Sequence, residues 1–470
     1  MDKFFHSVRI NEELCKGCIN CIKRCPTEAI RVRNGKASIN RKMCIDCGEC
    51  IRICENHAKY AEVDTLADME KYKYRIALPA PTLYCQFNNL DDKNIVLNSL
   101  LKMGFDDVFE VAAGAEYVSE ATRKFLKEHE DGMPWISTAC PTVVRLIRVR
   151  FPGLIKHLLP LNPPVEVAAE IAVKRAMEKT GLKRNEICTV FITPCPSKNT
   201  YAKAPLGIKK TEIDIVVAMK EIYPKLLAAM KAVAAENYDD ISEAGRIGIS
   251  WGFSGGEAGG ALCNNYLAAD GIENVIRVLE DLEDEKLGGL EFVELDACAG
   301  GCVGGVLTVE NPYLSVARLH KMRRYLPVQL SHMEDDKNID EESEKKQILE
   351  FKNDIEYEPV LQMGDSVIEG FVRLNQAERL AKTLPGLDCG SCGAPTCKAL
   401  AKDIVKGEAR KEQCIYLMRS HIAELSKELQ SAAREVKNGS KSAMEVANEY
   451  IDRISTEMLE ATEKGGGVGH

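Results

Sequence analysis

Residues 291–302 read Glu-Phe-Val-Glu-Leu-Asp-Ala-Cys-Ala-Gly-Gly-Cys, and this stretch decides the fold of the central part of the chain. Its apolar run predicts a buried strand, and the glycine-rich segment that follows places two cysteines in the loop at the end of that strand. The other predicted elements of this region are strands at 75–78, 187–192, 213–217 and 246–250 and helices at 166–180 and 256–270. Strands that alternate with helices favour an α/β architecture with parallel sheets, in which ligands bind at the carboxyl ends of the strands.

Cysteine is the residue type that the composition singles out. The chain has 470 residues, of which 19 are cysteine, and its formal net charge is -9. The length indicates about three domains, and the acidic balance argues against a protein that follows nucleic-acid phosphates. No run of about 18 apolar residues predicts a membrane span, and residues 1–6 lack the apolar core of a signal peptide. We therefore expect a cytoplasmic protein whose reduced cysteines bind metal or take part in redox chemistry.

Two cysteine motifs near the N-terminus have the spacing of bacterial ferredoxins that hold two clusters. The first is Cys15-x2-Cys18-x2-Cys21-x3-Cys25-Pro26, and the second is Cys44-x2-Cys47-x2-Cys50-x3-Cys54. In this pattern three thiolates of one run reach one 4Fe–4S cubane and the fourth reaches the other cubane. The spacing predicts one cluster on Cys15, Cys18, Cys21 and Cys54 and a second on Cys44, Cys47, Cys50 and Cys25. Two zinc sites are the alternative, which the double register of eight cysteines disfavours.

Four more cysteines lie in three loops of the central region, at Cys140, Cys195, Cys298 and Cys302. Thiolates from three distant loops can hold one further cubane where the loops of parallel sheets meet. Cys298 and Cys302 would face one direction if a helical turn began there. The glycines around them would let the backbone approach a bulky inorganic group.

A third metal-binding pattern, Cys389-x2-Cys392-x4-Cys397-x16-Cys414, lies towards the C-terminus. It resembles the small 4Fe–4S domain of corrinoid iron–sulfur proteins, and zinc is the alternative. Apolar residues then step by three and four positions from Ile415 to Val436 and resume out of phase from Met444 to Met458, which is a heptad pattern. A helical hairpin packed on its own domain and a helix that joins a second copy or another partner both remain open.

The three central cysteine loops resemble the signature loops of the FeFe hydrogenases, in order and across the central region. The matching segments are 134–141, 193–198 and 294–305. The resemblance implies an H-cluster, which is a 4Fe–4S cubane joined to a two-iron unit that carries CO, CN and an azadithiolate. It implies that Cys140, Cys195 and Cys298 bind the cubane only. Cys302 would bind the cubane and also bridge to the two-iron unit, which makes it a catalytic residue.

Other segments match residues that line the cofactor in this family. Lys198 matches the lysine that donates a hydrogen bond to one cyanide, and Ser197 lies beside it. The tripeptide Ala80-Pro81-Thr82 resembles the Ala-Pro-Ser segment that lines the other cyanide. The stretch Trp251-Gly252-Phe253-Ser254-Gly255-Gly256 resembles the family's Phe-Gly-x-Thr-Gly-Gly stretch beside the two irons, so Trp251, Gly252 and Ser254 join the expected cofactor-binding residues.

The departures from the family pattern concern proton delivery. A cysteine of the first loop passes protons to the active site in the family, whereas this chain has Ala139 there, and a methyl group has no proton to relay. Gly259 replaces a usual acidic residue, and Asp296 replaces a methionine. Loss of a positioned relay commonly costs about 10²–10⁴-fold in rate, so we expect slow turnover. Asp296 is the expected catalytic substitute, and Glu257 and Glu116 are further candidates.

Together these patterns predict an FeFe hydrogenase of the sensory branch, which reversibly converts H2 to protons and electrons and reports the presence of H2. The predicted cofactors are two ferredoxin-type 4Fe–4S clusters, one C-terminal 4Fe–4S cluster and the H-cluster. Besides H2 and protons, the expected partners are a redox or signalling protein and, through the C-terminal helix, a second copy of the chain. The alternative is a non-enzymatic iron–sulfur scaffold or an electron-transfer protein that lacks the two-iron unit.

The predicted fold is an α/β hydrogenase-type domain of two lobes with parallel sheets, a small α+β ferredoxin domain and a helical C-terminal 4Fe–4S domain. The predicted boundaries are 1–68 for the ferredoxin domain, 69–335 for the H-cluster domain, 336–357 for a charged linker, 358–420 for the C-terminal 4Fe–4S domain, 421–463 for the heptad-patterned helix and 464–470 for a flexible tail.

Overall fold

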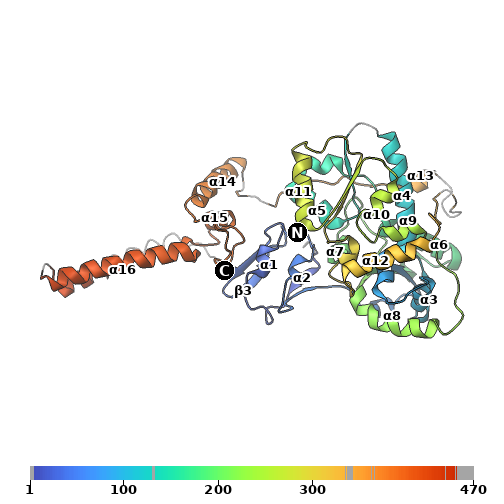
Figure 1. Cartoon of the computed structure of the whole chain (residues 1–470), viewed down its shortest axis with the longest axis horizontal. Coiled ribbons are helices and arrows are strands. Elements are labelled where there is room, and N and C mark those ends of the chain that lie inside the picture. Colours follow the sequence, from blue (N-terminus) through green and yellow to red (C-terminus); the bar gives the residue numbers. More distant parts are fainter. Residues whose placement is uncertain are drawn as a thin grey trace. The chain divides into compact units, whose positions relative to one another are not determined.

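The computed structural model describes residues 5–129, 133–333, 335, 342–360, 363–364, 366–439, 441–449 and 451–452. The chain divides into two compact units (Figure 1). The first comprises residues 1–16, 24–29 and 39–360, and the second comprises residues 17–23, 30–38 and 361–470. The predicted tail, the last eleven residues of the heptad pattern at 453–463 and residues 336–341 of the predicted linker lie outside the described residues.

One parallel sheet forms the first lobe of the first unit. Its strands are β5 (Tyr74–Pro79), β6 (Asp107–Val108), β8 (Ile187–Thr193) and β9 (Ile215–Ala218), in the order β6-β5-β8-β9. All seven residues of β8 are buried, as expected for a central parallel strand covered on both faces. The helices that follow or cover these strands are α3 (Asn94–Lys102), α6 (Pro164–Thr180), α7 (Pro196–Lys203) and α8 (Met219–Val233).

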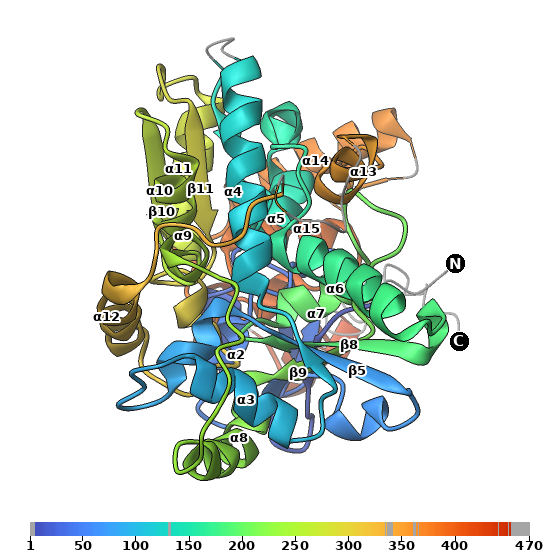
Figure 2. The same ribbon diagram turned by 90° about the vertical axis from the view of Figure 1, so that its right-hand side faces the viewer.

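A second parallel sheet forms the other lobe. Its strands are β7 (Trp135–Ile136), β10 (Tyr266–Asp270) and β11 (Phe292–Asp296), in the order β10-β11-β7. Helices α4 (Val111–Glu128), α5 (Pro141–Arg150) and α11 (Ile272–Glu283) belong to the same region, and Figure 2 shows α4 between the strands of the two sheets. The predicted α/β architecture of two lobes with parallel sheets is confirmed.

Smaller elements complete the two units. In the first unit, β1 (Val8–Ile10) pairs antiparallel with β4 (Lys59–Ala61) beside α2 (Glu49–Arg52), and α12 (Pro312–Met322) and α13 (Glu342–Leu349) lie further along the chain. The second unit includes α1 (Asn20–Lys23), α14 (Val367–Ala381), α15 (Cys397–Val405) and α16 (Ile415–Lys437). The strands β2 (Ile30–Arg33) and β3 (Lys36–Ile39) form a hairpin.

Partly buried ion pairs join that hairpin to the C-terminal part of the second unit. Asp403 accepts a bidentate contact from Arg31, at 2.7 and 3.0 Å, and a further hydrogen bond of 2.8 Å from Arg33. The backbone amide of Val32 donates to the carbonyl of Gly393. Because bidentate arginine–carboxylate contacts fix geometry as well as charge, residues 30–38 are an integral part of this unit.

The prediction of a strand at 246–250 is wrong, because these residues form the helix α9 (Arg246–Ser250). A short apolar run cannot by itself distinguish a buried strand from a buried helix. The structure decides through Glu116 of α4, whose Oε1 accepts hydrogen bonds from the amides of Gly245 and Gly248 at the start of α9. A Cβ at Gly248 would lie 2.0 Å from the carbonyl oxygen of Ala112, so glycine lets α9 contact α4 directly.

The predicted helix at 256–270 is correct only in its first part. The helix α10 (Gly256–Ala261) ends at Leu262, which has a left-handed φ of 55°, and residues 266–270 form strand β10. A side chain in that conformation is strained, so the chain leaves the helix there. The five residues of β10 pair with β11 along their whole length.

The described part of the heptad-patterned helix buries none of its residues. The side chains of Met418, Ile422 and Leu429 of α16 are exposed, whereas Leu417 packs, partly buried, against the apolar cluster of the C-terminal domain. Residues 443–449 are also helical. A hairpin and a helix that joins a partner both stay predictions. Within the described residues, none of the helices is both long and apolar enough to cross a lipid bilayer.

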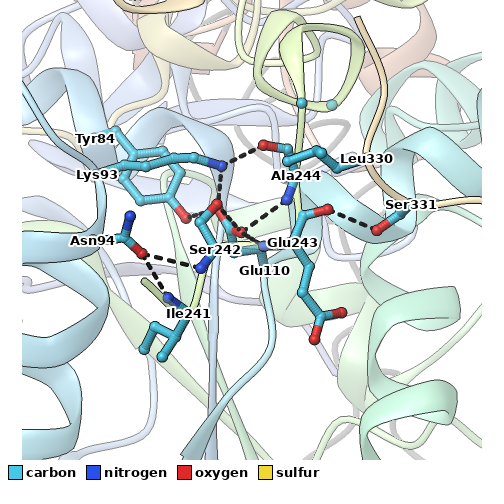
Figure 3. Close-up of polar contacts among 12 residues, drawn as sticks. Tyr84, Lys93, Asn94, Glu110, Ile241, Ser242, Glu243, Ala244, Leu330 and Ser331 are labelled. Carbon is cyan, nitrogen blue, oxygen red and sulfur yellow. Dashed lines mark hydrogen bonds and ion pairs between the residues drawn. The ribbon is translucent and has the colours of Figure 1, made fainter. Parts of the chain in front are cut away.

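A buried carboxylate at the start of α4 ties the long loop before α9 to the first lobe (Figure 3). Oε1 of Glu110 accepts hydrogen bonds from the hydroxyl of Tyr84, at 2.7 Å, and from the ammonium group of Lys93, at 3.2 Å. Oε2 accepts from the hydroxyl of Ser242 and from the amides of residues 243–244, at 2.7–3.0 Å. Because each lone pair of this carboxylate has a partner, the loop that leads into α9 is held in one conformation.

We predict that Glu110→Ala destabilises the protein by about 3–5 kcal/mol, because it leaves the Lys93 ammonium buried without its carboxylate partner. Differential scanning calorimetry measures the change. Glu236→Ala is the matched control, since Glu236 pairs with Lys102 on the surface, where ion pairs contribute little. Equal losses for the two variants would contradict a special role of the Glu110 network.

Candidate functional site

Three loops at the carboxyl ends of parallel strands bring four thiols together. Cys140 precedes α5 after strand β7, Cys195 precedes α7 after β8, and Cys298 follows β11. Cys302 begins the short 3-10 helix at Cys302–Gly304. Burial is the main reason that the pKa of the Cys298 thiol is raised, and the neighbouring charges of the other three cysteines raise it further. The predicted cysteine quartet therefore lies in one place in the fold.

Glycines allow the third loop to approach the neighbouring segments. Gly300 and Gly301 have φ values of 80° and 88°, so residues 298–302 form a turn and not the helical turn expected from the i, i+4 spacing. A Cβ at Gly301 would lie 2.5 Å from the amide nitrogen of Ser254. A Cβ at Gly305 would lie 2.3 Å from the carbonyl oxygen of Pro194. These contacts set the position of Cys302 relative to the second loop and to the segment at 251–254.

Lys198 is the positive charge of this site. Its Nζ lies 3.7 Å from Sγ of Cys302. Burial by itself would lower the pKa of Lys198, but the charges of Cys302, Cys195 and Cys140 raise it above its ordinary value. In turn, burial raises the pKa of Cys302 to about 12, and Lys198 opposes that rise. Lys198 is thus protonated beside thiol groups that a metal would hold as thiolates.

The hydroxyl of Ser197 has no hydrogen-bond partner within the described part of the chain, although the side chain is fully buried. Buried polar groups without a partner are rare and call for an explanation such as a bound group. Ser197 lies between Cys195 and Lys198 in sequence, at the start of α7. The donor set of thiols, ammonium and hydroxyl fits an anionic metal cluster.

The predicted cofactor-lining segments meet at the same site. The carbonyl of Gly252 accepts the amide of Val303, at 2.9 Å, and the amide of Ser254 donates to the carbonyl of Gly300, at 3.2 Å. A Cβ at Gly252 would lie 3.5 Å from the methyl group of Thr82, so residues 80–82 face this segment. Thr82 is fully buried at the start of the 3-10 helix Pro81–Gln86, which Ala80 precedes.

Trp251 is anchored away from the third loop. Its indole Nε1 donates a hydrogen bond of 2.9 Å to the hydroxyl of Ser119 on α4. Its polar atom is therefore occupied within the protein, and Trp251 fixes the position of the glycine-rich segment that follows it. A contact of this residue with a cofactor would use the ring and not the indole N–H.

Buried acidic groups surround Ala139. The hydroxyl of Ser137 lies 2.8 and 2.7 Å from the two carboxylate oxygens of Glu257 and also accepts the amide of Ala139, at 3.2 Å. Burial raises the pKa of Glu257 to about 8. Burial also raises the pKa of Asp296 to about 6, with Lys198 acting in the opposite direction. Glu257 is therefore mainly protonated at neutral pH, whereas Asp296 is mainly ionised there, so the first could donate a proton and the second could accept one.

Glu116, the third expected relay, does not belong to this site. Its Oε1 accepts hydrogen bonds from the amides of Gly245 and Gly248. Its Oε2 accepts hydrogen bonds from the amides of Leu330 and Ser331. Burial raises the pKa of Glu116, and these four backbone donors lower it. The prediction of a proton relay at Glu116 is therefore wrong, because its carboxylate is used to hold backbone segments.

The second ferredoxin-type loop packs against the central site. A Cβ at Gly48 would lie 2.6 Å from the side chain of Val306 and 3.4 Å from that of Pro196. Arg52 donates a hydrogen bond of 2.6 Å to the carbonyl of Gly304. Burial raises the pKa of Cys47 well above its ordinary value, and the neighbouring charges of Cys25, Cys50 and Cys44 raise it further. These four cysteines are the predicted ligands of one cluster.

The other two predicted cluster sites are described within single units only. Cys15 and Cys54 belong to the first unit and Cys18 and Cys21 to the second, so their joint quartet stays a prediction. In the second unit, burial raises the pKa of Cys392, and the charges of Cys389 and Cys414 raise it further. Cys397 begins α15, and its amide donates to Asp388. This C-terminal quartet has the donors of a cubane or a zinc site.

Three family models match this chain. "Iron only hydrogenase large subunit, C-terminal domain" matches residues 73–266. Residues 73–266 are therefore similar to this domain of iron-only hydrogenases. "4Fe-4S dicluster domain" matches residues 7–55, and a model of an Fe-S cluster segment matches residues 384–416. The segment that is similar to hydrogenases thus has a match to an iron–sulfur model on either side in the sequence.

Known relatives are similar over part of their length. Iron hydrogenase 1 of Clostridium pasteurianum is 25% identical over 290 residues, which are 50% of this chain and 50% of that protein. The NADP-reducing hydrogenase subunit HndD of Solidesulfovibrio fructosivorans is 23% identical over 361 residues, which are 63% of this chain and 56% of that protein. The chain therefore spans about half the length of these curated relatives.

Solved structures of hydrogenases are also similar. A variant of FeFe-hydrogenase HydA1 from Chlamydomonas reinhardtii aligns with 63% of this chain and 98% of its own, at 15% identity and a TM-score of 0.49. Another neighbour, described as a step of H-cluster assembly in HydA(deltaEFG), aligns with 63% of this chain and 97% of its own, at 15% identity and a TM-score of 0.48.

Sequence analysis missed several residues of the site. The predictions do not include Ser137, Glu294 and Arg52. Glu294 accepts hydrogen bonds from the amides of Gly255 and Ala258, at 2.8 and 2.7 Å. The signal for Glu294 was a charged residue in the middle of an otherwise apolar strand, where a carboxylate needs hydrogen-bond donors. Ser137 lies only two residues before Ala139, but its partner Glu257 is distant in sequence.

We predict that Glu257→Gln raises the melting temperature relative to the wild type, and that the difference grows between about pH 5 and pH 8. The pKa of Glu257 is raised from 4.5 to about 8, so over this range the folded state keeps a proton that the unfolded state releases. Stability of the wild type therefore falls as pH rises, whereas the amide does not titrate. Thermal melts across this range measure the effect, with the exposed Glu283→Gln as control. A pH-independent difference would refute the assignment.

Proposed function

We propose that this chain is an FeFe hydrogenase that reversibly converts H2 to protons and electrons at an H-cluster, with low turnover, and that it serves to sense H2. The observation that carries the proposal is the convergence of four thiols from three loops around the protonated Lys198, with the unpartnered hydroxyl of Ser197 beside it. When bound, an H-cluster supplies the open coordination site at which H2 is split or formed.

The chain's own residues would hold that group in defined roles. Cys140, Cys195 and Cys298 would bind the cubane, and Cys302 would bind it and bridge to the two-iron unit. Lys198 would donate a hydrogen bond to a cyanide ligand, which its protonation and its place beside Cys302 support. The segments 80–82 and 251–254 would enclose the two-iron unit, and Gly252 would let it approach the backbone.

Electrons would move through the quartet of Cys25, Cys44, Cys47 and Cys50. Its loop lies in the same compact unit as the central site, and Ile45 of that loop belongs to the same buried apolar cluster as Ala297. A cluster ligated there would be the nearest electron donor or acceptor to the central site. The remaining two 4Fe–4S clusters would extend the electron path to a redox or signalling partner.

Protons would reach the site by a route that replaces the missing cysteine. Asp296 lies close enough to Lys198 and Cys302 for its charge to act on both. Glu257 holds a proton near neutral pH and is hydrogen bonded to Ser137, which contacts the backbone of Ala139. We assign Asp296 and the Glu257–Ser137 pair as proton carriers. The methyl group of Ala139 interrupts direct transfer, which would make turnover slow.

A sensory role is favoured by slow turnover together with an exposed C-terminal helix. The apolar side chains of Ile422 and Leu429 on α16 are more than half exposed, at 56% and 57%. Exposed apolar residues with a heptad period are typical of a helix that joins another helix. We propose that α16 joins a second copy of the chain or a cytoplasmic signalling protein.

Anaerobic maturation with a synthetic two-iron complex, followed by infrared spectroscopy, tests the hydrogenase proposal. We expect CO and CN stretching bands in the matured wild-type protein and their loss in Cys302→Ala, which removes the bridging thiol. Cys263→Ser is the matched control, because Cys263 lies outside the quartet, and it should keep the bands. If the wild type shows no bands, the proposal fails and a scaffold or electron-transfer role without the two-iron unit takes its place.

We predict that Ala139→Cys raises the rate of H2 evolution at least tenfold, because it restores an S–H group where direct proton transfer is interrupted, and a positioned relay is worth about 10²–10⁴-fold. Gas chromatography with a chemical reductant measures the rate after maturation. Ala139→Val is the control, since it changes volume without adding a proton. An unchanged rate in Ala139→Cys would show that proton delivery at this position does not limit turnover.

A further inference from the structure

A cavity of about 540 Å³ lies beside α10. Its walls come from α9, α10 and the end of α12 with the 3-10 helix that follows, Arg323–Tyr325. Three of its lining residues are the arginines Arg246, Arg323 and Arg324, and His320 is a fourth basic residue. Of the described residues that line it, none carries a carboxylate. A volume of this size suits a small-molecule ligand.

The arginines face this cavity without acidic partners. Within the described residues, the guanidinium groups of Arg246 and Arg324 make no ion pair or hydrogen bond, whereas that of Arg323 donates to the hydroxyl of Ser250, at 3.2 Å. Burial lowers the pKa of His320, and the charges of Arg323 and Arg324 lower it further. Positive charge is therefore concentrated in a recess of the surface, where it attracts anions more strongly than on an open face.

Glycines form the floor of the cavity. Gly255, Gly256, Gly259 and Gly260 all line it, so backbone atoms face a ligand directly. A Cβ at Gly259 would meet nothing within 4 Å, which means that this position points into open space. A side chain at residue 259 would extend into the cavity, and its absence leaves room for a ligand.

We propose that this cavity is a binding site for a small phosphate-bearing anion. Guanidinium groups match phosphate oxygens in a planar, bidentate geometry, and several of them around one recess are a phosphate-recognition arrangement. The chain has no P-loop or Gly-x-Gly-x-x-Gly motif, so the site is built from arginines and bare backbone and not from a phosphate loop.

An anion bound here would contact the segment that lines the central site. The guanidinium of Arg323 lies 5.4 Å from the ring of Phe253, and the ring of His320 lies 4.5 Å from the same ring. The amide of Gly255, one of the floor residues, donates to Glu294 behind it. The ligand would therefore be sensed by residues 250–256. The binding itself does not depend on the proposed hydrogenase activity.

Isothermal titration calorimetry of the full-length protein with inorganic pyrophosphate tests the proposal. We expect saturable binding to the wild type and at least tenfold weaker binding to the double variant Arg246→Gln/Arg324→Gln. The matched control is Arg277→Gln, which removes an exposed arginine of α11 outside the cavity and should bind as the wild type does. Gly259→Glu is a second variant, in which a carboxylate would occupy the cavity and abolish binding. Circular dichroism verifies that each variant is folded.

Three results would overturn the proposal. The first is that pyrophosphate shows no saturable binding to the wild type. The second is that it binds the double variant as tightly as Arg277→Gln. The third is that the wild type binds succinate as tightly as pyrophosphate, which would indicate a general anion site without phosphate recognition. Infrared bands of the matured protein provide a separate readout. A band shift on addition of pyrophosphate would support contact with residues 250–256, and its absence with binding intact would overturn that contact alone.

Discussion

The close approach of four thiols to one buried ammonium group is the constraint on which the central site depends. Burial raises the pKa of Cys140 and Cys195 to about 11 and that of Cys302 to about 12, so these groups resist ionisation in the folded protein. Metal coordination requires thiolates, and the negative charge that they bring has to be compensated within the protein. Lys198, at 3.7 Å from Cys302, supplies the compensating charge where the loops meet. Removing it would leave buried negative charge without a partner, which is among the most costly changes a protein interior can suffer.

The two sheets and a few glycines bring those groups together. Strands β7 and β11 of one sheet and β8 of the other all end at the same place, so their loops meet although they are far apart in sequence. Gly301 and Gly305 then allow contacts at distances that any Cβ would prevent. Gly48 does the same for the ferredoxin-type loop. The arrangement therefore depends on close contacts between backbone segments. It also gives the loop of Cys44, Cys47 and Cys50 a common apolar core with the central site.

Local spacing in the sequence predicted the candidate metal-ligating cysteines, because a cubane would fix how cysteines are spaced within one loop. It also predicted strands β5, β8, β9 and β11 from their apolar runs. It could not predict α9, since the choice between strand and helix at 246–250 depends on the carboxylate of Glu116, more than a hundred residues earlier in the chain. For the same reason Glu116 was taken for a proton relay. A buried acid that caps backbone amides and a buried acid that carries protons look alike in sequence and differ only in their partners.

The contacts around Ala139 decide which proton route is open at the position where the sequence lacks the expected cysteine. A hydroxyl group can donate one proton and accept two hydrogen bonds. Ser137 accepts a hydrogen bond from the amide of Ala139 and donates its own proton to the carboxylate of Glu257, at 2.7 Å. Burial raises the pKa of Glu257 to about 8, although this hydrogen bond lowers it, so the carboxylate takes up a proton near neutral pH. The proton of Ser137 is directed to Glu257 and not past the methyl group of Ala139. A proton route through Ser137 would therefore pass through the carboxylate of Glu257.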